Sequence, residues 1–220
     1  MPAPAVVVYV IVGAVAIVTG LSFYMWWNWG KIVIALKGKN IAILGSEGVG
    51  KTTLNEFLHG GEIKPESKIL KRNILKLQDL KFYVKDGEDV SGGDMYLGKW
   101  KDLFLKSNIT LYLFDSKKVY DGDKEYIDEI INRMRLLSSW KQEKNKNIQM
   151  VMIGTYSDLI DGIYSKKSAK LINEKIKENI TPALNQGDID HDNLIVGSLK
   201  DDNNIQILVG ALLVLLYKKK

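Results

Sequence analysis

The sequence predicts an α/β domain built on a mostly parallel six-stranded sheet with helices on both faces, preceded by one transmembrane helix. Three observations indicate this fold. An uninterrupted apolar run occupies the N-terminus, short apolar segments alternate with longer amphipathic ones from residue 40 onward, and a glycine-rich loop follows the first apolar segment of that region. We divide the chain into a tail at 1–4, a membrane helix at 5–29, a basic linker at 30–39, the α/β domain at 40–217 and a basic tail at 218–220.

The N-terminal segment Ala5–Trp29 is apolar almost throughout and carries no charge. At about 1.5 Å per residue it is long enough to cross a hydrocarbon core of about 30 Å. Aromatic residues gather at its C-terminal end, and Lys31, Lys37 and Lys39 follow at once. A secretory signal peptide would have a basic start and a shorter apolar run. We therefore expect a single-pass protein that contacts membrane lipid, with its N-terminus outside and its large domain in the cytoplasm.

The composition excludes several classes of site. The net charge of +5 belongs to the residues after the apolar run, and no block of aromatic residues interleaved with basic ones indicates base stacking. We therefore expect no nucleic-acid partner. The chain has no cysteine, which rules out a disulfide framework, a thiolate nucleophile and a cysteine-based metal site.

The elements of the domain follow from its apolar segments. Strands are expected at Ile41–Leu44, Ile74–Leu77, Lys81–Lys85, Thr110–Phe114, Ile148–Ile153 and Leu194–Val196. Helices are expected at Thr52–Leu58, Met95–Lys106, Lys124–Lys141, Lys166–Glu178 and Ile205–Tyr217. Because helices separate the strands after the first hairpin, the sheet should be mostly parallel.

Two segments near the C-terminus bear on where the last helices end and how they pack. Thr181-Pro182 should interrupt the chain after the fourth helix of the domain, because proline disrupts a helix interior. The apolar run Ile205–Tyr217 is too short to span a membrane. We expect it to be the last packing helix of the domain.

One glycine-rich motif predicts the chemistry of the domain. It has the pattern G-x-x-x-x-G-K-[ST], and it consists of Gly45, Ser46, Glu47, Gly48, Val49, Gly50, Lys51 and Thr52, followed by Thr53. Such a loop between a strand and a helix turns its backbone N–H groups around phosphates. Lys51 should reach the β- and γ-phosphates and act in catalysis, and the Thr52 hydroxyl should ligate Mg²⁺. The motif therefore predicts a bound nucleoside triphosphate with Mg²⁺.

A D-x-x-G motif, Asp89–Gly92, follows the third predicted strand. Asp89 should hold Mg²⁺ through water, and the Gly92 N–H should bond the γ-phosphate. Gly92 is therefore a second candidate catalytic residue, in a loop that senses hydrolysis.

Two later motifs predict that the base is guanine. Asp158, after the fifth predicted strand, stands where an N-K-x-D motif places a carboxylate that accepts two donors from the edge of guanine, which adenine does not offer. Ser198, Leu199 and Lys200 follow the last predicted strand. Each motif alone is common by chance, but each lies at a strand's C-terminal end, where open α/β sheets bind ligands. GTP or GDP is therefore the expected nucleotide.

With these motifs in this order, the chain resembles the Ras-like small GTPases, and among them the Arf branch and the β-subunit of the signal-recognition-particle receptor. The resemblance covers residues 40–217 and includes Lys51–Thr53, Asp89–Asp94 and Leu111–Asp115. It implies a P-loop NTPase fold of the Ras-like type. It also implies that Ser198–Lys200 sets a backbone N–H against the guanine oxygen.

Two departures from this family concern hydrolysis. Gly93 occupies the position of the Gln that orients the attacking water, so hydrolysis should be slow or partner-dependent unless Asp94 or another residue substitutes. The family also ligates Mg²⁺ through a Thr of the first switch, and no Thr occurs between residues 53 and 110. Ser67 is the candidate replacement, the alternative being an ordinary loop serine.

A third departure concerns the base. Thr155-Tyr156 replaces the Asn-Lys of the N-K-x-D motif. The lysine stem of the family lies against the base, so Tyr156 either stacks there or is simply packed at the strand end.

Two functions fit these observations. The first is a nucleotide-dependent switch that recruits a cytoplasmic or membrane protein partner to the membrane. The second is a receptor or scaffold subunit that holds GTP without cycling, supported by Gly93 and the missing switch Thr. A P-loop ATPase or kinase would leave the positions of Asp158 and Ser198–Lys200 unexplained.

Overall fold

The computed structural model describes residues 39–58, 97–144, 147–161 and 166–218. Along the chain these residues form β1 Ile41–Gly45, α2 Lys51–Leu58, α4 Leu97–Lys106, β2 Ile109–Asp115, α5 Ser116–Asp121, α6 Lys124–Glu143, β3 Gln149–Thr155, the 3-10 helix η2 Ser157–Leu159, α7 Lys166–Gln186, β4 Leu194–Val196 and α8 Asp202–Lys218. This order alternates strands with helices, as the sequence predicts.

The strands form a parallel sheet, which confirms the predicted fold class. The described part holds four strands in the order β1-β2-β3-β4, each parallel to its neighbour. The two further strands expected at Ile74–Leu77 and Lys81–Lys85 lie outside the described residues, as does the membrane helix expected at Ala5–Trp29. Within the described part, no helix has the length and apolar character needed to cross a bilayer.

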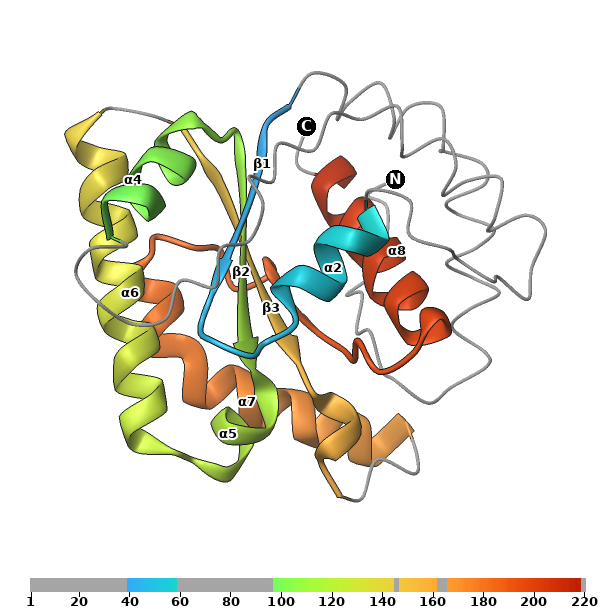
Figure 1. Ribbon diagram of the computed structural model, residues 1–220. Helices are drawn as coiled ribbons and strands as arrows, with labels where there is room; N and C mark the ends of the chain where they lie inside the picture. Colours follow the sequence, from blue (N-terminus) through green and yellow to red (C-terminus); the bar gives the residue numbers. More distant parts are fainter. Residues whose placement is uncertain (1–38, 59–96, 145–146, 162–165, 219–220) are drawn as a thin grey trace, which may run out of the picture.

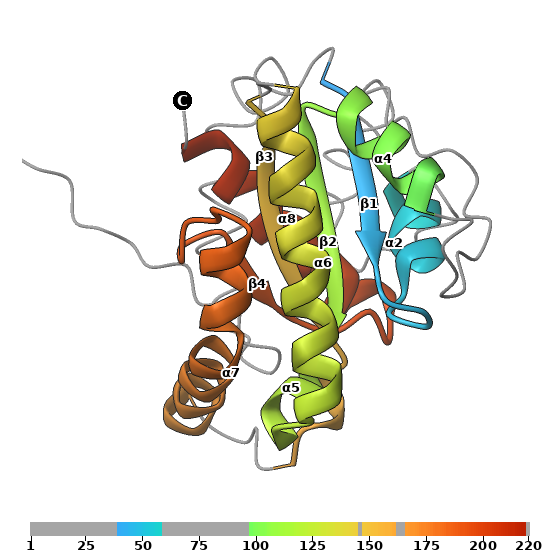
Figure 2. The same ribbon diagram turned by 90° about the vertical axis from the view of Figure 1, so that its left-hand side faces the viewer.

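Side chains of the sheet alternate between two apolar cores. Residues at odd positions, such as Leu111 and Leu113, pack with α2 and α8. Residues at even positions, such as Tyr112 and Phe114, pack with α4, α5, α6 and α7. Figure 1 shows α2 and α8 on one side of the sheet and α4 and α6 on the other, and Figure 2 shows α6 and α7 lying across that second face. A sheet that is buried on both faces explains why its strands are apolar without interruption.

The last helix, α8, packs inside the domain as predicted. Its buried side chains include Ile205, Leu208, Leu212 and Leu216. They belong to the same core as the odd positions of the sheet. The apolar side chains of α8, which raised the question of a membrane segment, therefore pack against β1, β2 and β3.

Helix α7 differs from the sequence-based expectation. The expected interruption at Thr181-Pro182 is wrong, because the helix continues through Pro182 to Gln186. A proline inside a helix costs about 3 kcal/mol. Burying one leucine contributes roughly 1.5–3 kcal/mol, and the helix beyond Pro182 buries both Ala183 and Leu184 completely. The buried stripe that starts at Ile172 therefore continues past the proline.

Helix α5 was not expected from the sequence. Its N-cap is Asp115, whose carboxylate accepts hydrogen bonds from Lys117 N at 2.8 Å and Lys118 N at 3.1 Å. Its C-cap is Gly122, in the left-handed conformation with φ +79°. Asp121-Gly122 therefore forms a turn at the end of a short helix. The caps matter because a helix this short has little propensity of its own.

Replacing the N-cap residue of α5 should destabilise the domain measurably. We expect Asp115→Ala to lower the free energy of unfolding by about 1 kcal/mol, because the first turn of α5 loses its acceptor. For a domain of this size that corresponds to a melting temperature lower by roughly 2–4 °C. Thermal unfolding followed by circular dichroism measures the shift. Asp102→Ala, an exposed aspartate on α4, is the control, and equal melting temperatures for the two variants would contradict the capping role.

Candidate functional site

The predicted motifs meet at one edge of the sheet. In the register of the parallel strands, Gly45 lies beside Leu113, and Gly154 lies beside Val196. The loops that leave β1, β3 and β4 therefore emerge at the same edge, which is also where α5 begins (Figure 1). This is the edge at which open α/β sheets bind their ligands.

The glycine-rich loop has the backbone that its motif predicts. Gly45 has φ +146°, and a Cβ there would lie 2.2 Å from the carbonyl oxygen of Leu113. Gly50 has φ +86°, and a Cβ there would lie 2.5 Å from Leu199 Cδ1. At Gly45 only glycine fits both the conformation and the space beside the backbone of β2, and at Gly50 the positive φ favours glycine. The loop is therefore shaped by close approaches to β2 and to the segment after β4.

The loop and the start of α2 form a cradle suited to phosphate. Lys51 is half-buried, and its Nζ donates to the Ser46 carbonyl oxygen at 2.6 Å, across the loop. The N-terminus of α2 adds backbone N–H groups and the positive end of the helix dipole. A loop of N–H donors with a lysine folded across it fits the phosphates of a nucleotide.

Thr52 is the described residue that suits a magnesium ion. It is exposed at the first turn of α2, next to the lysine that would meet the phosphates. The other two predicted ligands, Asp89 and Ser67, lie outside the described residues, as do Gly92 and Gly93. Elsewhere in the described part there is no group of three or more His, Cys, Asp or Glu side chains able to hold a metal. Among the described residues, Thr52 thus offers a hydroxyl ligand, which fits an ion held mainly by phosphate and water.

The two predicted base-recognition segments are joined by hydrogen bonds. Ser198 is completely buried, and its Oγ donates to Asp158 Oδ1 at 2.6 Å. The same Oγ accepts from Lys200 N at 3.0 Å. The backbone adds a bond from Ser157 N to Gly197 O at 3.1 Å. The carboxylate of Asp158 is thus held in one orientation by the segment after β4, as a residue that reads a base edge requires.

Thr155 is only 1% exposed. Its Oγ1 donates to the Phe114 carbonyl oxygen at 3.2 Å, and its own carbonyl oxygen accepts from Ser116 Oγ. Its side chain therefore joins β3 to β2, and this arrangement favours a positioning role over direct contact with the nucleotide.

Tyr156 reaches from the base-recognition segment to the phosphate loop. Its backbone is in the left-handed region, with φ +59° and ψ +26°, which is unusual for a residue other than glycine. Its hydroxyl donates to the Gly48 carbonyl oxygen. The sequence pointed to Tyr156 as a residue near the base, but it gave no signal for this contact with the loop.

A buried polar cluster lies beneath the phosphate loop. The Ser46 hydroxyl is near the phenols of Tyr112 and Tyr126, and among the described residues neither it nor the Tyr112 hydroxyl has a hydrogen-bond partner at normal geometry. The Tyr126 hydroxyl accepts from Asp115 N at 2.8 Å. Burial raises the pKa of Tyr126 to about 12, and burial followed by the neighbouring Tyr126 raises the pKa of Tyr112 further. Both phenols are therefore neutral at physiological pH.

Comparisons with known proteins give distant structural similarities. No protein-family model matches the chain, and no curated protein matches its sequence. Among solved structures, a probable GTP-binding protein, EngB, is similar with a TM-score of 0.46 and 14% identity, over 82% of this chain and 99% of that one. The ADP-ribosylation factor-like GTPase Sar1 of Encephalitozoon cuniculi, in complex with GDP, is similar with a TM-score of 0.48 and 16% identity, over 92% of this chain and 90% of that one. At these values, what those proteins bind does not carry over to this chain.

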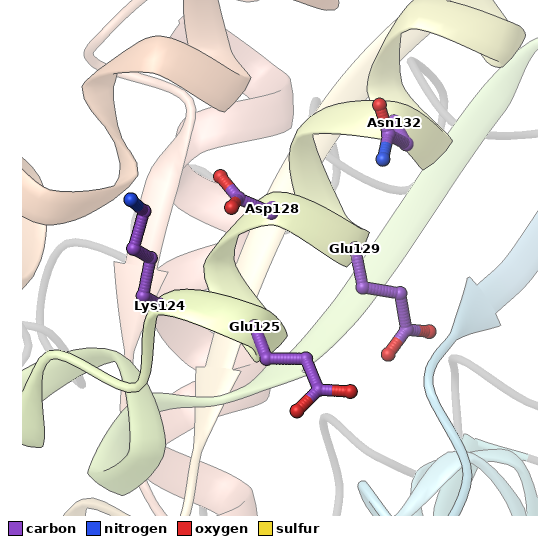
Figure 3. Close-up of a pocket in the computed structure, with 5 residues that line it drawn as sticks. All are labelled: Lys124, Glu125, Asp128, Glu129 and Asn132. Carbon is purple, nitrogen blue, oxygen red and sulfur yellow. The ribbon is translucent and has the colours of Figure 1, made fainter.

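A shallow hollow along the first half of α6 contains none of the predicted site residues. It is lined by Lys124, Glu125, Asp128, Glu129 and Asn132. Figure 3 shows the side chains of Glu125 and Glu129 extending to the same side of the helix. All five residues are exposed. These residues therefore form a solvated, charged face of the helix.

Proposed function

We propose that the chain is a membrane-anchored small GTP-binding protein that acts as a nucleotide-dependent switch. The phosphates lie in the loop Gly45–Gly50, with Lys51 across them and Thr52 on Mg²⁺. Guanine lies against Asp158, and the backbone of Ser198–Lys200 meets its oxygen. GTP and GDP are the two ligands, and they differ in the γ-phosphate that the Asp89–Gly92 loop would contact.

One observation supports this proposal above the others, namely the orientation of Asp158 beside the phosphate cradle. Ser198 Oγ donates to its carboxylate at 2.6 Å, and Tyr156 joins the same segment to the loop through Gly48. A carboxylate fixed in this way accepts two donors from a base edge. Guanine presents an N–H and an amino group there, whereas adenine presents an acceptor.

Hydrolysis of GTP to GDP and phosphate should be slow in the isolated protein. Gly93 has no side chain to orient the attacking water. Lys51 and the loop N–H groups can stabilise charge on the phosphates, but they cannot take over that role. A partner protein that supplies the missing group would accelerate the reaction, as groups supplied in trans do in other GTPases.

The apolar run Ala5–Trp29 supports permanent attachment to a membrane. The three lysines that follow it favour the cytoplasmic side for the domain. With a permanent anchor, the bound nucleotide would control which cytoplasmic or membrane protein is recruited and would leave the location of the protein unchanged.

The nucleotide retained by the purified protein tests this proposal. The full-length chain is purified in mild detergent and denatured, and the released nucleotide is identified by chromatography. We expect GDP, or GDP with some GTP, and selective rebinding of guanine over adenine nucleotides. Retention of ATP or ADP, or equal affinity for GTP and ATP, would contradict guanine recognition.

The same measurement distinguishes the second candidate function. Intact GTP alone, not converted to GDP over hours of incubation, would favour the GTP-holding receptor or scaffold subunit. Gly93 and the absence of a switch Thr are the observations in favour of that candidate. A single-turnover assay with Mg²⁺ then gives the hydrolysis rate directly.

A further inference from the structure

Two side chains of the base-recognition segments contact the phosphate loop. The Tyr156 hydroxyl donates to the Gly48 carbonyl oxygen, across a separation of 108 residues in the sequence. Leu199, which lies between Ser198 and Lys200, packs against Gly50, so closely that a Cβ on Gly50 would be 2.5 Å from Leu199 Cδ1. The loop is therefore contacted at two of its glycines by the two segments expected to read the base.

The Tyr156 contact bears on how the loop presents its donors. Gly48 is exposed with φ +73°, and no atom lies within 4 Å of the place where its Cβ would be. Gly48 therefore has no side-chain packing of its own that would restrict this peptide. Because a trans peptide group is planar, with its C=O and N–H pointing in opposite directions, a Gly48 carbonyl oxygen held by Tyr156 aims the N–H of Val49 the other way. The tyrosine hydroxyl can thus fix the direction of one loop N–H.

The Leu199 contact acts on the other end of the loop. Leu199 is half-buried and packs against the core shared by β1 and α8. Its neighbour Ser198 is the residue that holds the Asp158 carboxylate. A displacement of Ser198 and Leu199 would therefore move both the Asp158 carboxylate and Gly50, the residue that precedes α2.

We propose that Tyr156 and Leu199 are positioning residues that hold the phosphate loop in its anion-binding form and couple it to the base site. The proposal rests on the guanine-nucleotide function proposed above. The energetic consequence is specific. Tyr156 then contributes more to a ligand with a β-phosphate, which the loop and Lys51 enclose, than to a ligand with the base and one phosphate only.

Removal of the tyrosine hydroxyl tests the coupling. Affinities of the full-length chain in detergent are measured by calorimetry for GDP and for GMP. We expect Tyr156→Phe to weaken GDP binding about three- to tenfold, the effect of one net hydrogen bond, and GMP binding by less than about twofold. Tyr156→Lys, which places a donor at similar reach without the ring, should restore part of the GDP affinity. Tyr120→Phe is the matched control, because Tyr120 lies on α5 and its ring packs under Lys175 Nζ of α7.

A second variant tests the other contact. Leu199→Ala keeps the backbone of the base segment but opens space beside Gly50, and we expect the same pattern, a loss of about three- to tenfold for GDP and a smaller one for GMP. Melting temperatures check that each variant is folded. If Tyr156→Phe does not fold, the GDP and GMP affinities of Leu199→Ala test the proposal.

The outcomes separate the two proposals. Equal losses for GDP and GMP, or no loss in either variant, would overturn the coupling and leave the guanine-nucleotide function intact. Failure of the unaltered protein to bind any guanine nucleotide would overturn both.

Discussion

Replacement of Lys51 by alanine should weaken the affinity for GTP and GDP on the order of 100-fold, which is the loss of one or two charge-assisted hydrogen bonds. In the structure Lys51 Nζ lies within the loop, 2.6 Å from the Ser46 carbonyl oxygen. It therefore needs little rearrangement to meet phosphate oxygens. The variant should also lose any hydrolysis, because the lysine is the only side chain of the loop motif with a positive charge. Equilibrium titration with a fluorescent GDP analogue measures the change.

Lys170→Ala is the matched control for this variant. Lys170 is an exposed lysine of α7 that pairs with Glu174 at 3.6 Å, and its removal should change neither nucleotide affinity nor stability appreciably. The expected difference between the two lysines comes from their positions, since the change in net charge is the same. If Lys51→Ala binds GDP as tightly as Lys170→Ala does, the loop is not a phosphate site.

The parallel α/β architecture and the phosphate loop were predictable because their signals are local. Apolar strands followed by amphipathic segments predict the sheet, and Gly45, Gly50 and Lys51 carry their conformational and chemical requirements in their own residue types. Helix α5 was missed because six residues show no useful periodicity, although its caps at Asp115 and Gly122 were visible in the sequence. The course of α7 through Pro182 was not predictable from propensity, because burial in the tertiary structure outweighs the cost of the proline.

The site was predictable as a set of residues but not as a set of contacts. Their motifs at the ends of two predicted strands indicated that Asp158 and Ser198 lie near one ligand, and the structure adds that they are hydrogen-bonded to each other. The contacts of Tyr156 with Gly48 and of Leu199 with Gly50 join loops far apart in the chain, and no local pattern specifies which side chain crosses the gap. The buried phenol of Tyr112 beneath Ser46 was missed for the same reason, since its strand reads simply as apolar.

Changing Asp158 to Asn should invert the preference among purine nucleotides. In the proposed site the carboxylate accepts from both the ring N–H and the amino group of guanine, whereas an asparagine amide can accept from only one of them and leaves its own NH₂ facing a donor. We expect the affinity for GDP to fall on the order of 100-fold, because polar groups in a built site are left unpaired. Xanthine carries an oxygen in place of the amino group, so xanthosine diphosphate should bind the variant more tightly than it binds the unaltered protein.

The exchange of preference distinguishes base recognition from general damage to the site. A variant that is merely less stable loses affinity for both nucleotides, whereas a variant with an altered base contact loses one and gains the other. Ser198 Oγ can still donate to the asparagine oxygen in place of Asp158 Oδ1, so the side chain should keep its orientation. Asp161→Asn, an exposed aspartate three residues further along, should leave both affinities unchanged. An unaltered preference for GDP over xanthosine diphosphate in Asp158→Asn would remove Asp158 from the base site and, with it, the main support for guanine as the ligand.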